Sequence, residues 1–419
     1  MDDEFPPPCP PHPPPPDDGE AALASLPADL VREYLGCVRC NIDRHRAGTR
    51  GETWRAQIRM LEPLPPPLPL LLVPRSDGPP VFHCVLSNWR THPYFVRERA
   101  HAARFYGSYD GSWLFVSLRQ NDQHFLLNLE RPHVRINLPN THLRSSLVPP
   151  FHFRPKVVED RIVIVAATFT RQPTEQGCVA AGIIGYPPCC PAEDKWHVAF
   201  WGMGNGEPVI SQSFPPTNED LEVEDLLYSP GPEMFRFLTR GEHIREFHQP
   251  IFPLCDMDTQ VQYFQRRGRD DDRPVLARYL VKSRGKLLMV VRLGTREPPS
   301  PTMAFRLFQP KVRIITNAQG KVDAEHHWAE LRALDGRILF VGRGCSRSYD
   351  VAQRYPFMEG IYFLDDRSFH DHRIAFRNRA RRRYHCNDVG KWSGTPPQVR
   401  QCISEYGPSN ESSPVWVIP

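Results

Sequence analysis

The sequence predicts a mainly β protein: a β-propeller of about six or seven blades, preceded by a small α-helical module. From about residue 80 onward, short β-rich runs follow one another at a spacing of roughly ten residues, with turn residues between them. No long amphipathic helix interrupts this pattern. A region of about 350 residues is too long for a single ordinary sandwich, but it would hold about six or seven four-stranded blades.

The sequence predicts four parts in the chain. Residues 1–21 are acidic and proline-rich, which favours a disordered tail with polyproline II character. Residues 22–62 form the helical module. Residues 63–79 form a stiff proline-rich linker that leads into the propeller, and residues 80–419 form the propeller itself.

The helical module is predicted from two apolar stripes. The first begins just after Pro27, a residue tolerated near a helix start, and comprises Leu30, Val31, Tyr34, Leu35 and Val38. The second comprises Trp54, Ile58 and Leu61. Gly48 and Gly51 precede this second stripe and are expected to weaken a helix there by about 1 kcal/mol each relative to alanine.

Several strand pairs are predicted within the β region. Residues 282–285 (KSRG) separate two β-rich runs and give the clearest hairpin of the chain. Trp113–Leu118 is expected to pair with residues 125–129. Residues 305–308 and 312–316 are expected to form two further paired strands around a proline.

Residues 328–366 organise the rest of the β region. Residues 329–333 alternate between apolar and charged side chains, as in a strand with one wet face. Asp335-Gly336 is a tight-turn dipeptide, because glycine accepts a positive φ and aspartate tolerates one. The run 338–341 does not alternate, so this strand is expected to be buried on both faces, and residues 360–366 complete a three-stranded meander.

The same stretch carries a family resemblance. Its residues stand in the order Trp328, Ala333-Leu334-Asp335-Gly336, a strand with Phe340, Gly342-Arg343-Gly344-Cys345-Ser346 and Ile361-Tyr362-Phe363-Leu364-Asp365-Asp366. Further motifs follow the same family order: residues 107–114, 127–129, 136–139, 387–390 and 414–419. The chain is similar to a plant family whose members join an N-terminal F-box to a KIB-type β-propeller, once catalogued as domain of unknown function 295. The resemblance covers most of residues 63–419.

The resemblance implies a role in protein recognition. The opening Leu26-Pro27-Ala28-Asp29-Leu30-Val31 resembles an F-box, although Tyr34, Val38 and Gly51 depart from the family pattern. By this resemblance the chain would be the substrate receptor of an SCF-type E3 ubiquitin ligase, docking on a Skp-type adaptor and cullin ligase while the propeller holds a target protein. The adaptor-binding residues that it implies are Leu26, Pro27, Asp29, Leu30, Val31, Leu35 and Trp54. The alternative is a non-ligase propeller scaffold with a decayed F-box.

The sequence predicts no catalytic, cofactor-binding or metal-binding residues. The candidates weighed are the glycines of residues 202–206, the thiol pairs Cys37/Cys40 and Cys189-Cys190, His326-His327, residues 270–272 and the run 344–348. The glycines lack a third glycine and a following helix, the thiol pairs lack a second pair of zinc ligands, and the run 344–348 lacks the second glycine of a nucleophile elbow. Adjacent histidines in a strand point to opposite faces, and residues 270–272 lie among arginines, as in a solvated loop. A non-enzymatic protein is therefore predicted, with an enzyme that uses the central channel as the remaining possibility.

Charge and composition limit the partners and the compartment. The formal net charge is +4, which indicates neither nucleic acid nor an anionic membrane as a partner. The strongest local feature is the basic run from Arg373 to Arg383, which we interpret as an exposed loop, an import signal or a patch for an acidic partner. The eleven scattered cysteines and the absence of a signal-like or spanning segment favour cytosol or nucleus.

The apolar C-terminus predicts how the ring closes. Residues 414–419 are apolar although they lie at a terminus, where polar residues are usual. A propeller gains stability by pairing its last strand into the first blade, because both edges would otherwise remain open. We therefore expect residues 415–418 to be β-structure, with Trp416 buried near residues 81–118.

Overall fold

The fold is described from a computed structural model. The described residues are 26–61, 63–76, 78–96, 100–138, 142–146, 154–158, 162–186, 196–203, 209–212, 219–250, 259–265, 273–296, 301–316, 322–353, 355–368, 372–403 and 406–419. The chain divides into two compact units, Met1–Pro67 and Leu68–Pro419. No helix within the described residues is both long enough and apolar enough to cross a membrane.

The first unit contains three short helices. They are α2 (Ala28–Cys37), α3 (Asn41–Gly48) and α4 (Glu52–Met60). Its core is formed by Val31 and Leu35 of α2, Ala47 of α3 and Trp54 of α4, all at most 1 % exposed. Each helix is too short to be stable alone in water, so this small core holds the unit together.

The two glycines of this unit lie at helix ends and not within a helix. Gly48 is the last residue of α3, and Gly51 is the N-cap of α4. A Cβ atom at Gly48 would lie 3.2 Å from Cδ1 of Ile58, so glycine allows α3 and α4 to approach closely. The expected loss of helix stability therefore does not apply in full, because a helix terminus tolerates glycine.

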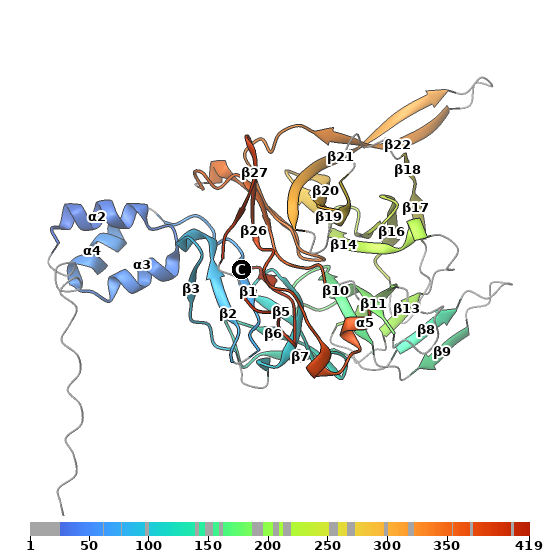
Figure 1. The fold of residues 1–419 in the computed structure, drawn as a ribbon, viewed down its shortest axis with the longest axis horizontal. Helices are drawn as coiled ribbons and strands as arrows, with labels where there is room; N and C mark the ends of the chain where they lie inside the picture. The colour runs from blue at the N-terminus through green and yellow to red at the C-terminus, as the bar shows by residue number, and fades with distance from the viewer. Residues whose placement is uncertain are drawn as a thin grey trace, which may run out of the picture. The chain divides into compact units, whose positions relative to one another are not determined.

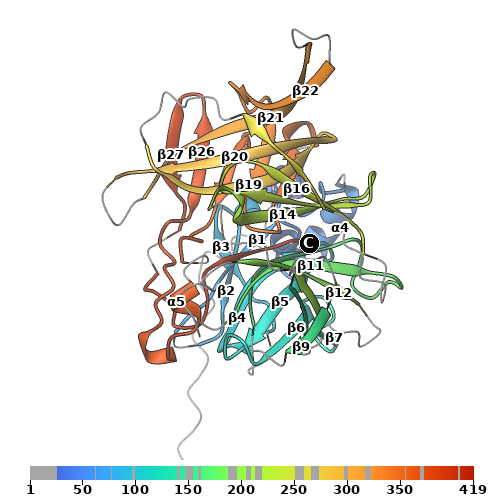
Figure 2. The ribbon, with the colours of Figure 1, turned by 90° about the vertical axis from the view of Figure 1, so that its right-hand side faces the viewer.

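The second unit is a ring of six β-sheets. Figures 1 and 2 show how the strands of these sheets are arranged. Blade 1 contains β28 (Val415–Val417), β1 (Leu70–Val73), β2 (Val81–Cys84) and β3 (Arg90–His92). Blade 2 contains β4 (Ala103–Tyr109), β5 (Trp113–Leu118), β6 (Gln123–Asn128) and β7 (Arg135–Asn137). Blade 3 contains β10 (Val163–Phe169), β11 (Val179–Gly185), β12 (His197–Gly202), β13 (Val209–Gln212), β8 (His142–Ser146) and β9 (Arg154–Val158).

The remaining three blades complete the ring. Blade 4 contains β14 (Val223–Ser229), β15 (Met234–Thr239), β16 (Ile244–His248) and β17 (Thr259–Gln262). Blade 5 contains β19 (Val275–Ser283), β20 (Lys286–Gly294), β21 (Thr302–Thr316), β22 (Val322–Leu331) and β18 (Phe264–Gln265). Blade 6 contains β24 (Arg347–Asp350), β23 (Arg337–Phe340), β25 (Gly360–Phe363), β26 (Gly390–Gly394) and β27 (Pro397–Gln401). The inner strands β28, β4, β10, β14, β19 and β24 contact one another in this order.

The C-terminal strand closes the ring, as predicted. β28 pairs antiparallel with β1, with Trp416 opposite Leu71, and Figure 1 places the C-terminus beside β1. Trp416 is fully buried, and its indole Nε1 donates a hydrogen bond to the carbonyl oxygen of Val341 at 2.9 Å. The Ser108 hydroxyl donates to the carbonyl oxygen of Trp416 and accepts from the backbone N–H of Ile418. Blade 1 therefore combines the two ends of the propeller chain, and β28 covers the edge that β1 would otherwise leave open.

A short segment of blade 6 fills the axis of the ring. We call residues 342–346 the axial plug. The backbone N–H of Gly344 donates to Oδ1 of Asp225 on β14 at 2.7 Å, and a Cβ atom at Gly344 would lie 2.6 Å from the carbonyl oxygen of Ala167 on β10. A Cβ atom at Gly107 on β4 would lie 3.9 Å from the carbonyl oxygen of Arg343. Because inner strands of three blades meet this segment, the central channel is occupied by the protein's own backbone.

Two predicted turns are confirmed. Asp335 and Gly336 have φ values of +54° and +73°, and Arg284 and Gly285 have values of +49° and +74°. The second pair joins β19 to β20, whose residues Ser283 and Lys286 face each other. The predicted pairing of β5 with β6 is also confirmed, and residues 338–341 are fully buried as expected.

Two predictions were wrong about strand arrangement. Residues 305–308 and 312–316 do not form two strands, because β21 is one strand of 15 residues that continues through Pro310. Residues 328–366 do not form one meander: β22 belongs to blade 5, whereas β23 and β25 belong to blade 6 and pair parallel to each other. Figures 1 and 2 show β21 and β22 extending outward beyond the other strands of their blade.

Candidate binding site

The helical unit divides the predicted adaptor-binding residues into two groups. Val31, Leu35 and Trp54 are buried in its core, whereas Pro27, Asp29 and Leu30 are exposed and Leu26 is half-buried. Leu30 is 45 % exposed. Tyr34, one of the departures from the family pattern, is 48 % exposed, and its ring meets the edge of Trp54 at 5.7 Å between centroids. The exposed apolar surface of α2 is therefore centred on Leu30 and Tyr34.

The basic run of the sequence lies in a long connection between β25 and β26. This connection contains α5 (His372–Ala375) and η6 (Arg379–Arg381). The backbone of Tyr384 pairs in both directions with that of Ser409, at 2.8 and 2.9 Å, and the Tyr384 hydroxyl donates to Oε1 of Gln120 at 2.5 Å. Nε2 of Gln120 in turn donates to the carbonyl oxygen of Glu411 at 2.8 Å. The connection is thus fastened to blade 2 and to the segment that precedes β28.

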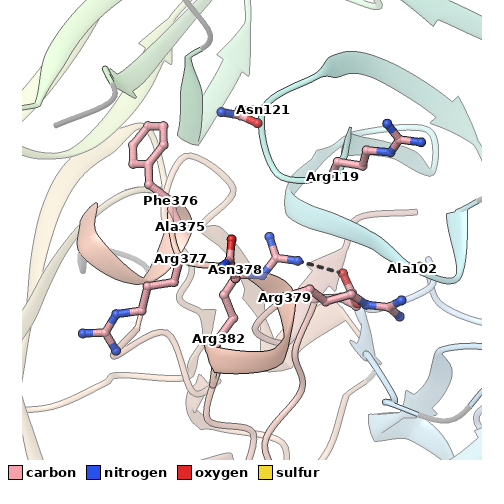
Figure 3. Close-up of a pocket in the computed structure, with 10 residues that line it drawn as sticks. Ala102, Arg119, Asn121, Ala375, Phe376, Arg377, Asn378, Arg379 and Arg382 are labelled. Atoms are coloured by element: carbon pink, nitrogen blue, oxygen red, sulfur yellow. Dashed lines mark hydrogen bonds and ion pairs between the residues drawn. The ribbon is translucent and has the colours of Figure 1, made fainter. Parts of the chain in front are cut away.

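A cleft of about 520 Å³ lies between this connection and blade 2. We call it the arginine cleft; its lining residues are Ala102, Arg119, Asn121, Ala375, Phe376, Arg377, Asn378, Arg379, Arg382 and Glu411. Figure 3 shows the two walls, with Arg119 and Asn121 on the turn after β5 and Ala375–Arg382 on the other side. Among the described residues, four arginines and one carboxylate line the cleft, so this part of its lining is positively charged.

The blade 2 wall is presented by an unusual turn. Arg119 and Gln120 both have positive φ values, +48° and +76°, although neither residue is glycine. Such conformations are disfavoured for residues with a Cβ atom and persist only where the surrounding structure holds them. Here the hydrogen bonds of Gln120 to Tyr384 and Glu411 hold the turn, which leaves the Arg119 side chain 87 % exposed at the rim of the cleft.

The single carboxylate is shared between two arginines. Glu411, whose side chain is 3 % exposed, forms ion pairs with both Arg379 and Arg382. Arg382 is 5 % exposed, and Nε of its side chain donates to the carbonyl oxygen of Asn410 at 3.0 Å. Burial lowers the pKa of the Arg382 guanidinium, and the nearby Tyr384 and Glu411 oppose this shift only in part. Burial also lowers the pKa of Arg104, and the positive charge of Arg382 contributes to this lowering.

Near the axis, charged groups are engaged by other parts of the protein. Arg292 of β20 is fully buried and donates to Oδ1 of Asp366 at 2.9 Å and to Oδ2 of Asp388 at 2.7 Å. The Tyr279 hydroxyl donates to Oδ2 of Asp366 at 2.8 Å. Asp366 and Asp388 come from two separate family motifs, and the structure brings both to one arginine of blade 5. The network therefore joins blade 5 to the connection that follows β25.

Several residues that the sequence analysis considered for chemistry lie in the described part of the chain. Cys345 is buried in the axial plug, where burial raises the pKa of its thiol to about 12, and the Ser346 hydroxyl donates to the carbonyl oxygen of Gly342. His326 and His327 face Val312 and Lys311 across β21, on opposite faces of the strand. Cys37 is exposed, whereas Cys40 is buried. Residues 189–190, 204–206 and 270–272 lie outside the described residues.

The arrangement of the second unit defines a class of protein first. Six sheets form a ring, the C-terminal strand closes it, and a plug fills its axis, so this unit is a β-propeller. The family model described as "KIB1-4 beta-propeller" matches residues 84–391, and the chain belongs to this family. Propellers of this kind are typically non-enzymatic scaffolds for protein interaction.

Comparisons with individual proteins add little to this assignment. The β-propeller domain of Cps50 (Swd1) from Myceliophteria thermophila is 14 % identical, with a TM-score of 0.32, over 61 % of this chain and 69 % of that chain. Hsv2 from Kluyvelomyces marxianus is 9 % identical, with a TM-score of 0.18, over 60 % of this chain and 92 % of that chain. These scores carry no argument about function. A search of the curated proteins found no match.

Proposed function

We propose that this chain is the substrate-receptor subunit of an SCF-type E3 ubiquitin ligase. In this arrangement the helical unit is a divergent F-box that docks on a Skp-type adaptor, and the propeller holds the target protein. Other subunits then carry out catalysis, and this chain holds the target protein in position for them. The observation that carries the proposal is a family propeller whose N-terminal unit exposes an apolar helix face, because buried apolar anchors often dominate such interfaces.

The exposed residues of α2 are assigned to the adaptor contact. Leu30 and Tyr34, with Pro27 beside them, are exposed, so an adaptor can contact them while the core of the unit stays intact. Val31, Leu35 and Trp54 contribute indirectly, because their packing in the core fixes the helices that carry this surface. Asp29 adds a negative charge in the first turn of α2, where a carboxylate is favoured by the helix dipole.

Substitution of Leu30 tests the adaptor contact. Leu30→Glu places a charge on the proposed interface and should weaken binding of a purified Skp-type adaptor about thirtyfold or more, which corresponds to about 2 kcal/mol. The matched control is Met60→Glu on α4, which changes another exposed apolar residue of the same unit, 67 % exposed. Leu26→Ala combined with Pro27→Ala should also abolish capture and leave the melting transition of the propeller unchanged.

The same binding measurement separates the ligase from the scaffold. A full-length chain that binds no Skp-type adaptor at micromolar concentration would end the ligase proposal and favour the non-ligase scaffold with a decayed F-box. Affinity purification of the tagged chain, with and without residues 1–62, identifies both partners. The adaptor should be lost with these residues, and the target should be retained by the propeller.

A further inference from the structure

We propose that the arginine cleft binds a phosphorylated serine or threonine side chain of a partner protein. This inference rests on the proposed role of the propeller in holding a target, and it names the chemistry by which a target would be recognised. It does not depend on the adaptor contact, which concerns the helical unit alone.

The lining of the cleft carries an excess of positive charge. Glu411 is the single acid among the lining residues and already pairs with both Arg379 and Arg382. One carboxylate cannot neutralise two guanidinium groups. Arg377 and Arg119 add two further positive charges at the exposed edges, of which Arg119 meets one acid outside the lining, Asp122, at 3.7 Å. Arg382 is buried, so its charge is poorly compensated by water. Four arginines thus face two carboxylates, Glu411 and Asp122, and an anion that enters the cleft finds an excess of positive charge.

A phosphate monoester fits this arrangement better than a second carboxylate. It carries about −1.5 to −2 charges near neutral pH and three acceptor oxygens, so it can pair with more than one arginine at once. Guanidinium groups form parallel, two-point hydrogen bonds with phosphate oxygens, and arginine clusters are a recurring device for recognising phosphorylated segments. Arg119 from one wall and Arg379 from the other would approach such a group from different directions.

The size and composition of the cleft indicate that the ligand is more than a free phosphate ion. Its volume of about 520 Å³ lies in the usual range of sites that enclose larger ligands. Phe376, Ala375 and Ala102 supply an apolar part of the lining, which suits the carbon atoms of a peptide beside the phosphate. A nucleic-acid strand would need a wider basic face with several aromatic platforms, whereas Phe376 is the one aromatic side chain among the described lining residues.

The binding test uses the full chain and fluorescence anisotropy. The probes are a labelled peptide pool with a central phosphoserine or phosphothreonine and randomised flanking residues, and the same pool without phosphate. The phosphorylated pool should bind at least about tenfold more tightly, because each charge-assisted contact contributes on the order of a tenfold change in affinity. Its binding should weaken as salt is raised. Equal binding of the two pools would overturn the proposal.

Matched arginine substitutions locate the binding. Arg119→Gln and Arg379→Gln, one on each wall, should each weaken binding of the phosphorylated pool about tenfold. The control is Arg381→Gln, which removes the same charge from the same basic run at an exposed residue that does not line the cleft. Unchanged melting temperatures would show that each variant folds. If Arg381→Gln weakens binding as much as the two cleft variants do, the effect is one of general charge and the proposal fails.

Two further probes exclude other anions. Inorganic phosphate should displace the phosphorylated pool only at far higher concentration, and a single-stranded RNA oligonucleotide should not compete at the concentration of the pool. Binding of either as tightly as the phosphopeptides would contradict the proposal. Loss of phosphopeptide recognition is distinguishable from failure of the ligase proposal, because adaptor capture by the helical unit is measured separately.

Discussion

Asp225 holds the axial plug in place, and its removal gives a quantitative test of the fold. The side chain is fully buried and accepts three backbone hydrogen bonds: Oδ1 from the N–H groups of Leu226 and Gly344 at 2.8 and 2.7 Å, and Oδ2 from the N–H of Leu280 at 2.7 Å. It thereby joins blade 4, blade 5 and the plug. Asp225→Ala leaves all three buried N–H groups without this acceptor, at about 1–3 kcal/mol for each group.

A graded pair of substitutions makes this test sharper. Asp225→Asn keeps an oxygen at the Oδ1 position but places an NH₂ group opposite the N–H of Leu280, so it should cost only about 1–3 kcal/mol. Asp225→Ala should lose at least about 2 kcal/mol more. Denaturant unfolding followed by tryptophan fluorescence measures both, with exposed Asp335→Asn as the control. Alanine and asparagine variants that lie within about 1 kcal/mol of the wild type would refute the role of Asp225 in holding the axial plug.

The same carboxyl group predicts a pH dependence. Burial raises the pKa of Asp225 to about 7 in the folded protein, from an ordinary value of 3.8. Between about pH 4 and pH 7 the folded state therefore binds more protons at this site than the unfolded state does, so its contribution to the free energy of unfolding falls as pH rises. Asp225→Asn cannot titrate at this site. The difference in free energy of unfolding between the wild type and Asp225→Asn should therefore change between about pH 4 and pH 7. Parallel pH curves would contradict the assignment.

Three further stability predictions follow from particular positions. Gly336→Val places a β-branched residue at a φ of +73° and should destabilise the fold by about 1–3 kcal/mol. Trp113→Ala removes a ring that is 4 % exposed, together with its hydrogen bond to Gln172, and should cost about 3–5 kcal/mol. Deletion of residues 412–419 removes the inner strand of blade 1 and should lower the melting temperature by several degrees at least. Wild-type unfolding midpoints or an unchanged melt would contradict these roles.

The sequence predicted those features of the fold that are determined locally. The dipeptide Asp335-Gly336 favours a turn with positive φ values whatever surrounds it. The apolar C-terminal residues indicate burial even when the strand that they pair with is unknown. β21 was predicted as two strands and not as one, because proline usually interrupts a strand and Pro310 lies between the two β-rich runs. Pairing of β21 with β20 ends at Phe308, so Pro310 has a registered neighbour only on the β22 side, and a strand can accommodate proline at such an edge.

Blade boundaries could not be predicted, because a tight turn does not reveal whether its two strands pair. Asp335-Gly336 joins β22 to β23, which belong to different sheets. The blades do share a structural repeat: four inner strands carry a register shift near their beginnings, at residues 105/107, 164/166, 223/225 and 275/277. The extra residue at each shift is Tyr106, Val165, Glu224 or Leu276, so no common residue type marks the repeat in the sequence.

The arginine cleft was predicted only in part, for a similar reason. The basic run is visible as a charge cluster, but Arg119 and Glu411 lie far from most of it in the sequence. The fold brings these residues together through Gln120 and Tyr384, two polar residues without a motif. Sequence patterns identify residues that are close along the chain, whereas this cleft depends on contacts between blade 2 and a connection from blade 6.

The axial plug determines where a propeller of this kind can meet a ligand. Beside the plug, Asp225 accepts from three backbone N–H groups, and Asp366 accepts from Arg292 and Tyr279. Gly344 has a φ of +69° and approaches Ala167 so closely that a side chain there would displace the plug. Recognition is therefore expected at clefts formed by connections outside the axis, where sequence can vary without disturbing the ring, and the arginine cleft lies in such a place.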